Sequence, residues 1–366
     1  MQITDLKLRN FRNYADCEVL FHPGLNFIAG RNAQGKTNLL ESLIYLSLTR
    51  SHRVIDDRKL IRYDQGFADI RCSFVKDRKK HVIESVITPK GKTLLVQKTP
   101  VHKSSEFIGQ LNVILFSPDD LRIFADPPKE RRRLINQEIT KISNRYLICL
   151  NRYQALLKQR NLFLKQNHTD RMYLDTLSEQ MSVEEAVIVN ERIQFCHAIN
   201  TVLSDLYISL SGDQDTHVEV IYKCCYENTS KQYIADMHKA STNKDIENRV
   251  TVTGIHRDDL IFLMNGRNLS ENASQGQKRM TMLAFKLALH RYIKKVTGED
   301  AVLLLDDVLS ELDPQKQKRL ISLVSTSSQC ILTAAHVPSF MMHTGIHMYV
   351  VENGTVRQED FNERSR

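Results

Sequence analysis

The stretch GRNAQGKT, residues 30–37, constrains the fold more than any other part of the sequence. It follows the apolar run LNFIA and leads into an amphipathic series that begins at Leu39. The pattern GxxxxGK[ST] between a strand and a helix is typical of a loop that wraps backbone N–H groups around a phosphate. The sequence therefore predicts an α/β fold with an anion-binding loop at the end of a strand.

Each residue type in this loop has a physical task. Gly30 and Gly35 allow the backbone path, Lys36 reaches the terminal phosphates of a nucleotide, and the Thr37 hydroxyl binds Mg²⁺. A surface turn that matches the pattern by chance is the alternative, and the flanking strand and helix patterns disfavour it. The remaining predicted nucleotide-binding residues of the loop are Arg31, Asn32, Ala33 and Gln34.

Length, charge and cysteine usage limit the classes of protein to consider. A chain of 366 residues can bury a full core and is expected to form two structural units. The formal net charge of +8 favours a polyanionic partner, with solvated lysines as the alternative. The seven cysteines form no CxxC pair and no zinc-like cluster, which predicts reduced thiols in a cytosolic protein. Since no window reaches the roughly 18 apolar residues of a membrane span, we expect a soluble, cytoplasmic protein.

Strand patterns dominate both ends of the chain. Short strands are expected at 3–11, 17–21 and 25–30, and residues 67–116 are expected to form a meander that ends in NVILF. The segment LIFLMNGRNLS predicts a hairpin that turns at Asn265 and Gly266. The other expected elements are strands at 217–226, 301–307 and 330–335, and helices at 231–240 and 280–295.

The middle of the chain has helical periodicity instead. Apolar residues alternate in steps of four and three from Ile135 to Leu156, which predicts one helix with a coiled-coil-like seam. The sequence NHTD at 167–170 interrupts this pattern, and a second apolar series runs from Leu174 to Leu206. Two segments of about 30 residues, each roughly 45 Å long, are expected to pair as an antiparallel arm. An ordinary pair of core helices is the alternative.

A second motif supplies acidic groups. The apolar run VLLL at 302–305 ends in Asp306 and Asp307, and carboxylates after a buried strand lie where open parallel sheets bind ligands. Asp306 is expected to bind Mg²⁺ opposite Thr37, and Asp307 to orient or deprotonate the attacking water. Lys36, Asp306 and Asp307 are thus the candidate catalytic residues, with a pair of solvated acids as the alternative.

A third motif, ASQGQKR at 273–279, again offers backbone donors at a helix N-terminus and predicts a second phosphate-sized site. One triphosphate does not need both sites within a single subunit. We therefore expect a homodimer in which the two loops bind the same ATP from different chains, with SELD at 310–313 near the two-fold axis. The candidate contacts with ATP in these segments are Ser274, Gln275, Gly276, Gln277 and Asp313.

These motifs, in this order and interrupted by a helical insertion, resemble ABC-type ATPases of the SMC branch and, more narrowly, the bacterial RecF family. The resemblance runs nearly end to end. It is carried by KLRNFRN at 7–13, GRNAQGKT at 30–37, SHR at 51–53, LFSPDDL at 115–121, KERRR at 129–133, GIHRDDL at 254–260 and LLDDVLSELD at 304–313.

The resemblance implies an α/β ATPase head, built on a mixed sheet with flanking helices, into which an α-helical arm is inserted. Residues 1–120 would form the N-terminal part of the ATPase domain with the Walker A loop, and residues 121–245 the mainly helical arm. Residues 246–366 would form the C-terminal part, with the signature motif and Walker B. The sequence ADPP at 125–128 lacks the glycine usual in the family, and TAAH at 333–336 does not align with the switch histidine of ABC proteins, so His336 receives no role.

The function implied by the resemblance is recombinational repair and replication restart. The family dimerises with ATP and Mg²⁺ on DNA, at gaps and single-strand/double-strand junctions. It works with RecR, and indirectly with RecO, to help load RecA in the response to DNA damage. Asp307, where many relatives outside the family have glutamate, predicts slow ATP hydrolysis that serves as a switch. A cytoplasmic, nucleoid-associated protein is expected.

Basic residues between 122 and 152 are the candidate contacts with DNA, because lysine and arginine rows bind phosphates without reading sequence. A solvated helix face is the alternative, and Lys7, Arg9 and Arg12 are weaker candidates. The residues expected to contact DNA are Arg131, Arg132, Arg133, Lys141 and Arg145.

Two other ATPase classes also fit a Walker loop. A transporter ATPase subunit is disfavoured by the helical insertion and by SQGQ in place of a transporter-like LSGGQ. A long-armed SMC protein or an ATP-dependent nuclease is disfavoured because the insertion is short and no further metal-ligand cluster is visible.

Overall fold

The structure, a computed structural model, describes residues 1–366 apart from 167–169, 328, 342–345 and 360–366. The chain forms two compact units. Unit 1 comprises Met1–Asp120, Leu206–Asp213 and the chain from Met280 onward, and unit 2 comprises Leu121–Asp205 and Gln214–Arg279. The division into ATPase and arm segments at 120 and 245 remains a prediction, since the two units are defined by packing alone.

Unit 1 contains an antiparallel six-stranded sheet in the order β2-β1-β4-β5-β6-β7. Residues of β1 alternate, so that Leu6 and Leu8 are buried while Lys7 and Arg9 are exposed, as expected for a sheet covered on one face. The strands are β1 (Gln2–Phe11), β2 (Tyr14–Leu20), β4 (Ala68–Lys76), β5 (Lys79–Thr88), β6 (Gly91–Val96) and β7 (Thr99–Val101).

The second sheet of unit 1 is mainly parallel, in the order β15-β14-β3-β13-β12-β8, with only β15 antiparallel to its neighbour. All residues of β12 and β13 are buried, which explains why both read as continuous apolar runs. The strands are β3 (Gly24–Ala29), β8 (Val113–Phe116), β12 (Val302–Asp306), β13 (Gln329–Ala334), β14 (His347–Glu352) and β15 (Thr355–Glu359).

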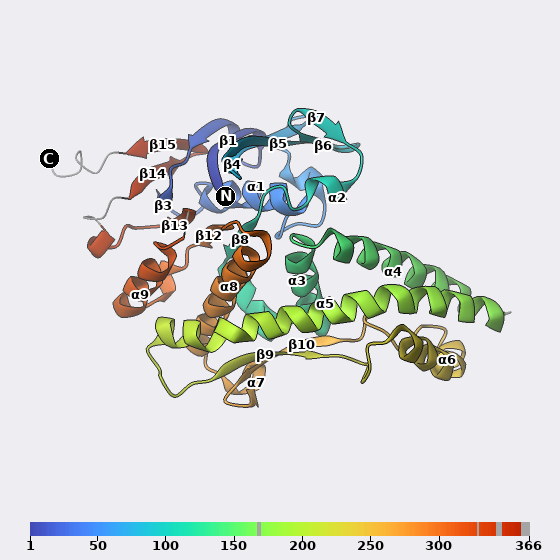
Figure 1. The fold of residues 1–366 in the computed structure, drawn as a ribbon. Coiled ribbons are helices and arrows are strands. Elements are labelled where there is room, and N and C mark those ends of the chain that lie inside the picture. The colour runs from blue at the N-terminus through green and yellow to red at the C-terminus, as the bar shows by residue number, and fades with distance from the viewer. Residues whose placement is uncertain (167–169, 328, 342–345, 360–366) are drawn as a thin grey trace. The chain divides into compact units, whose positions relative to one another are not determined.

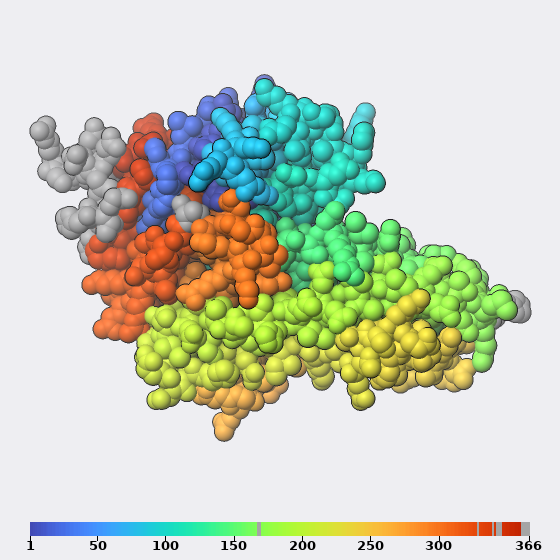
Figure 2. Space-filling view, viewed as in Figure 1, coloured from blue at the N-terminus to red at the C-terminus, as the bar shows by residue number. Residues whose placement is uncertain are grey.

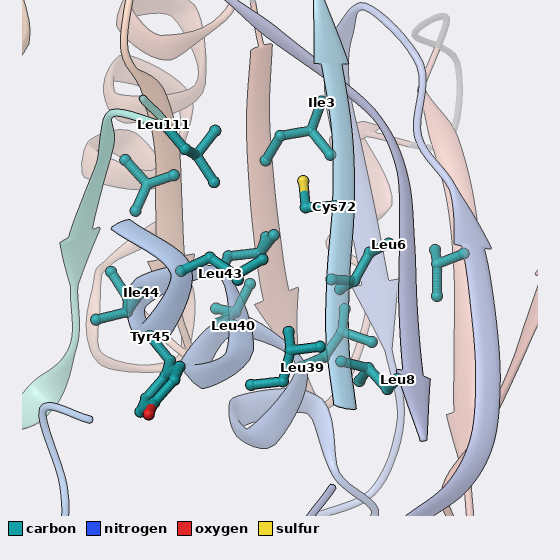
Figure 3. Close-up of a cluster of buried hydrophobic side chains, with 14 of the residues drawn as sticks. Ile3, Leu6, Leu8, Leu39, Leu40, Leu43, Ile44, Tyr45, Cys72 and Leu111 are labelled. Carbon is teal, nitrogen blue, oxygen red and sulfur yellow. The ribbon is translucent and has the colours of Figure 1, made fainter. Parts of the chain in front are cut away.

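Helix α1 (Lys36–Leu48) contacts strands of both sheets, β4 and β5 of the first and β8 and β12 of the second. Leu39, Leu40 and Leu43 point from α1 into the cluster that contains Leu6 and Leu8 (Figure 3). The main core of unit 1 is therefore built around this helix. The other α-helices described in unit 1, wholly or in part, are α2 (Ser104–Phe107), the C-terminal end of α5 (Arg171–Ser211), α8 (Gln275–Thr297) and α9 (Pro314–Val324).

One side chain links the two sheets directly. Gln329, at the start of β13, is fully buried, and its carboxamide accepts from the Ile3 N–H at 2.7 Å. The same group donates to the carbonyls of Ile3 and His22, both at 2.9 Å. Both main-chain groups of Ile3 in β1, and the His22 carbonyl in the β2–β3 connection, thus bind one amide, and the His22 carbonyl also accepts from Asn26 at 2.8 Å.

Unit 2 combines helices with the three-stranded antiparallel sheet β11-β10-β9 (Figure 1). Asn265 and Gly266, with φ of 50° and 74°, form the predicted turn between β10 and β11. The elements that lie in unit 2, wholly or in part, are α3 (Pro128–Thr140), α4 (Asn144–Phe163), α5 (Arg171–Ser211), β9 (Val218–Lys223), α6 (Lys231–Asn248), β10 (Asp259–Met264), β11 (Arg267–Asn268), α7 (Leu269–Asn272) and the first residues of α8. Short 3-10 segments occur at Asp57–Leu60, Pro118–Phe124 and Leu309–Glu311.

Two sequence-based expectations were wrong. Strands β4, β5 and β6 form a meander, but β8 does not join it, because β8 pairs in parallel with β12 in the other sheet.

The first helical series is two helices rather than one, because the Ser143 side chain caps a new helix by accepting the Tyr146 N–H at 3.1 Å. The second series is a single helix of 41 residues, longer than expected. Most of the predicted break at 167–170 lies outside the described residues.

No helix in the described ranges is long and apolar enough to cross a membrane. All seven cysteines are unpaired thiols, and five of them are buried.

Replacement of Gln329 by leucine should lower the free energy of unfolding by about 2–3 kcal/mol, because the buried N–H and carbonyl of Ile3 lose this partner, while the His22 carbonyl keeps its bond from Asn26. Equilibrium denaturation in urea measures this change. Gln358→Leu on the exposed strand β15 is the matched control and should change stability by under about 0.5 kcal/mol. Equal effects of the two substitutions would contradict the role assigned to Gln329.

Asp69 should make unit 1 less stable as the pH rises. Burial, and then the neighbouring Glu84, raise the pKa of Asp69 to about 6, against the opposing effects of Arg71 and Arg9. Because the unfolded chain releases this proton near pH 3.9, the native state holds an extra proton between about pH 4 and pH 6. The stability contribution of Asp69 is therefore present at pH 4 and lost by about pH 7.

Asp69→Asn should thus raise the thermal midpoint at pH 7 and leave it unchanged at pH 4. The gain should stay near 1 kcal/mol, because Asp69 is only partly buried and solvent screens its charge. Asp64→Asn, at an exposed turn, is the control and should show no such pH dependence. An Asp69→Asn variant with the same midpoint shift at both pH values would refute the titration.

Candidate nucleotide-binding site

The predicted phosphate loop lies between the end of β3 and the start of α1. Gly35 takes the position before the helix with φ of 121°, in the region that favours glycine. A Cβ on Gly35 would lie 2.6 Å from Asn13 Nδ2 and 2.9 Å from the Tyr14 hydroxyl. Gly35 is therefore required both by its backbone angle and by the close approach of these two side chains.

Neighbouring segments hold the loop in shape. The Asn13 amide donates to the Gln34 carbonyl at 2.8 Å, and the Tyr14 hydroxyl donates to the Gly35 carbonyl at 3.0 Å. From the β14–β15 turn, the N–H of Asn353 donates to the Gln34 side chain at 2.7 Å. These hydrogen bonds order the loop before any ligand binds. The loop therefore loses less conformational entropy on binding.

Lys36 is almost fully buried, at 7% exposure, yet its ammonium pairs with no carboxylate among the residues that the structure describes. It donates to the carbonyls of Gly30 and Arg31 within its own loop. Burial lowers the pKa of Lys36, while the charges of Asp307 and Asp306 oppose this shift. Since no described side chain caps α1, the first N–H groups of this helix and the Lys36 ammonium provide donors suited to an anion.

The acidic motif reaches the same loop. The Thr37 hydroxyl donates to Asp306 Oδ1 at 3.2 Å, and Thr333 donates to the same oxygen at 2.6 Å. Asp306 is only 6% exposed, so these hydroxyls satisfy a buried carboxylate. The sequence predicted the approach of Thr37 and Asp306 but not the contribution of Thr333, whose position depends on the pairing of β12 with β13.

Asp307 has an unusual backbone for a residue other than glycine, with φ of 50°. Its N–H points to both the carbonyl and the hydroxyl of Thr333, each at 3.1 Å. Its buried Oδ1 has no hydrogen-bond partner among the described residues. An unsatisfied buried acceptor beside a phosphate loop fits a site for water or a metal-bound ligand.

A further charged cluster lies behind the loop, and sequence reasoning missed it. Glu41 on α1 is fully buried and receives two hydrogen bonds from Arg12, at 2.8 and 2.9 Å. Ser51 also donates to this carboxylate, and Arg53 lies 3.6 Å from it. Burial alone would raise the pKa of Glu41, but the hydrogen bonds from Arg12 and Ser51 hold it below its usual range. Residues 51–53 had been noted only as part of the family resemblance, and Arg12 also as a weaker candidate for contact with DNA; in the structure Arg12 binds Glu41 instead.

The SQGQ loop forms a reciprocal cap at the start of α8. The Ser274 N–H donates to Gln277 Oε1 at 2.9 Å, and the Gln277 N–H donates to Ser274 Oγ at 3.2 Å. Ser274, Gln275 and Gly276 are exposed, and α7, which precedes them, projects at the lower edge of Figure 2. Asp313 is also exposed and caps α9 by accepting from the Lys316 N–H at 2.9 Å.

The residues predicted to contact DNA differ in whether their charged groups are already paired or are exposed to solvent. Arg131 is engaged by Asp259 at 2.7 and 2.9 Å, and Arg132 donates to the Asp258 carbonyl at 2.6 Å. Lys141 is 4% exposed and pairs with Glu138 at 2.8 Å. Only Arg133 and Arg145 leave their charged groups substantially open to solvent.

Removal of Arg12 should destabilise unit 1, because it leaves the buried Glu41 carboxylate without its strongest partner. Arg12→Ala should cost about 3 kcal/mol of unfolding free energy, measured by urea denaturation. Arg12→Lys should lose less unfolding free energy than Arg12→Ala but should remain less stable than the wild type, since lysine cannot form the bidentate contact with Glu41. The control Arg58→Ala removes an exposed pair with Asp56 and should leave the urea midpoint nearly unchanged. A similar cost for Arg12 and Arg58 would argue against the cluster as a structural support.

Known proteins share this arrangement of fold and loop. A family model described as the RecF/RecN/SMC N terminal domain matches residues 2–357. The DNA replication and repair protein RecF of Acholeplasma laidlawii (strain PG-8A) is 39% identical over 335 residues, which cover 91% of this chain and 93% of the relative. The protein of the same name from Bacillus velezensis (strain DSM 23117 / BGSC 10A6 / LMG 26770 / FZB42) is 37% identical, with coverage of 97% and 100%.

Solved structures agree with this assignment. A structure described as the recombination mediator protein RecF-ATP in the RecFOR pathway matches 98% of both chains with a TM-score of 0.90 and 27% identity. An Smc head bound to the C-winged helix domain of ScpA matches at 18% identity and a TM-score of 0.58, which indicates a shared fold alone. The predicted fold class, an SMC-type ATPase head with a helical arm, is confirmed. The chain therefore belongs to the RecF family of DNA replication and repair proteins.

Proposed function

We propose that the protein is an ATP-dependent DNA-binding switch of recombinational repair and replication restart. The observation that carries this proposal is the hydrogen bond of 3.2 Å between Thr37 of the phosphate loop and Asp306 after the buried strand β12. A phosphate loop and an acidic strand end in contact are the two parts of a Walker-type ATPase site. Family membership, and a relative solved with ATP, support the same ligand.

The residues present fit ATP with Mg²⁺. Lys36 and the first N–H groups of α1 would bind the terminal phosphates, with Gly30 and Gly35 allowing their approach. The hydroxyl of Thr37 and the carboxylate of Asp306 are the oxygen ligands that Mg²⁺ prefers, and they would hold it. When bound, Mg²⁺ supplies positive charge that stabilises the phosphate oxygens.

Asp307 would orient or deprotonate the attacking water through its unpartnered Oδ1. The Asp307 side chain is short, and a hydrogen bond to Thr333 holds the backbone N–H of Asp307 in place. The carboxylate therefore has little freedom to move towards a water molecule. This supports slow hydrolysis that resets a binding state, rather than rapid turnover.

A complete site is proposed to require two chains. The exposed N-terminus of α8, preformed by the cap between Ser274 and Gln277, would bind the triphosphate held by the loop of a second copy. Asp313, which is exposed, is proposed to lie near the same interface. Binding of ATP would therefore stabilise the homodimer by mass action.

The dimer is proposed to bind DNA at single-strand gaps and single-strand/double-strand junctions, together with RecR and indirectly with RecO, to promote RecA loading. The net charge of +8 supports binding to a polyanion. Because Arg131 and Lys141 are occupied by Asp259 and Glu138, we assign phosphate contacts first to Arg133 and Arg145.

ATP should drive dimerisation of the wild-type protein, as measured by light scattering with and without Mg²⁺. Lys36→Met should bind ATP at least about tenfold more weakly, because it removes a charged phosphate contact. Ser274→Arg should bind ATP normally but neither dimerise nor retain a gapped duplex at about 0.15 M salt. Wild-type affinity for DNA should rise with ATP and fall steeply with salt.

The matched control is Asn272→Arg, which adds the same charge at an exposed position two residues before Ser274. It should dimerise like the wild type, so that the effect of Ser274→Arg cannot be ascribed to charge alone. If all four proteins keep the same mass and bind DNA equally without nucleotide, the switch mechanism is refuted. If Ser274→Arg dimerises with ATP, the trans arrangement is refuted while the Walker site stands.

A further inference from the structure

Two adjacent cysteines, Cys224 and Cys225, follow strand β9 in unit 2. Both are partly exposed, whereas the other five cysteines of the chain are buried. Solvent can therefore reach this pair and has little access to the rest. Oxidation of a thiol requires both access to solvent and thiolate character. Cys224 and Cys225 differ from the other cysteines in the first requirement, access to solvent.

Hydrogen-bond donors surround the sulfur of Cys224. The Tyr226 N–H donates to Cys224 Sγ at 3.4 Å, and the thiol of Cys225 contacts the same sulfur. These donors favour a negative charge on Cys224 and lower its pKa, with the contact from Cys225 as the largest cause, against the opposing effects of burial and of the Asp258 charge. The opposite holds at Cys149, where burial raises the pKa to about 11. Thiolate character, the second requirement, thus also favours Cys224.

We propose that Cys224 and Cys225 form an oxidation site for peroxides, in which Cys224 is the attacking thiolate and Cys225 resolves its product as an intrachain disulfide. The partial exposure of both residues, the contact between their side chains and the N–H donor to Cys224 carry the proposal. It does not depend on the function proposed above, since it concerns unit 2 alone.

The chemistry balances with hydrogen peroxide as the oxidant. The Cys224 thiolate attacks one peroxide oxygen, the O–O bond breaks, and hydroxide leaves while the sulfur becomes a sulfenic acid. The hydroxide takes up the proton that Cys224 had released to solvent. The sulfur of Cys225 then attacks the sulfenic sulfur, an S–S bond forms and a second water leaves with the thiol proton of Cys225. Two thiols are oxidised and one peroxide is reduced to two waters.

The product should be easily reduced again. Adjacent Cα atoms are about 3.8 Å apart across a trans peptide, closer than the roughly 4.4–6.8 Å of ordinary disulfides. A disulfide between neighbours is therefore strained, and strained disulfides have more oxidising potentials. This suits a reversible modification rather than a structural bond.

Oxidation would also disturb the packing of unit 2. The Cys225 N–H donates to Asp258 Oδ1 at 2.9 Å, and the same buried carboxylate pairs with Arg192 of α5 at 3.4 Å and accepts from the Tyr222 hydroxyl. Closing a ring at 224–225 changes the direction of the Cys225 N–H. The hydrogen bond to Asp258 is then lost, so the link between the end of β9 and the Arg192–Asp258 pair is weakened.

The test uses the reduced full-length chain and hydrogen peroxide, with mass spectrometry of the peptide that contains both thiols. Alkylation by iodoacetamide should be at least about tenfold faster at Cys224 than at Cys149, because reactivity follows thiolate character and access. Peroxide should remove two hydrogen atoms from the peptide, and dithiothreitol should restore them. In Cys225→Ser, oxidation should stop at a sulfenic acid on Cys224 that dimedone traps.

Cys224→Ser should give neither the disulfide nor the dimedone adduct. Circular dichroism of both serine variants checks that unit 2 remains folded, and amide exchange at Cys225 and Tyr226 should rise on oxidation of the wild type. The proposal is overturned if peroxide leaves the peptide unchanged, or if Cys149 is oxidised as fast as Cys224. It is also overturned if the product is a disulfide between two molecules, visible as a dimer on a non-reducing gel.

Discussion

The burial of α1 between two sheets is the constraint on which the rest of unit 1 depends. Of its 13 residues, 10 are buried, including one lysine and one glutamate. A helix enclosed in this way cannot shift without loss of the core contacts of Leu39, Leu40 and Leu43 (Figure 3). The N-terminus of α1 is therefore held in place, and the phosphate loop that precedes it is rigid for the same reason.

Enclosure of α1 also explains the charged groups around it. A buried carboxylate such as Glu41 is tolerated only when it is paired and hydrogen-bonded, which accounts for the converging contacts from Arg12 and Ser51. Lys36 is buried and, within the described part of the chain, donates to loop carbonyls rather than to a carboxylate. One charge is thus neutralised as part of the structure, while the other is held where a phosphate could neutralise it.

Buried charge organises unit 2 in a different way. Arg160 and Asp245 are both fully buried and lie 2.7 Å apart, and Arg192 lies close to Asp258. Each pair joins elements distant in sequence, so each fixes how helices and strands of the unit pack. The arginines that face solvent, such as Arg145, have no such packing role and are the ones whose charge is available to a partner.

The sequence by itself determined the local elements of this protein and the chemistry of its nucleotide site. The spacing of Gly30, Gly35, Lys36 and Thr37 and the strand that ends in Asp306 predicted two segments that meet in the structure, because both motifs are local and tie side-chain type to backbone shape. The hairpin at Asn265 and Gly266 was predictable for the same reason, since its positive φ values favour these residues.

Only the tertiary structure decided which strands share a sheet and which charges are already occupied. A buried strand such as β8 has the same local pattern in either sheet, so its parallel pairing with β12 could not be read from its residues. Periodicity likewise hid the helix start at Ser143, because apolar residues continue in phase across it. The pairs Arg12–Glu41 and Arg131–Asp259 span 29 and 128 positions. Such contacts depend on how the whole chain folds, and a single sequence contains no local signal for them.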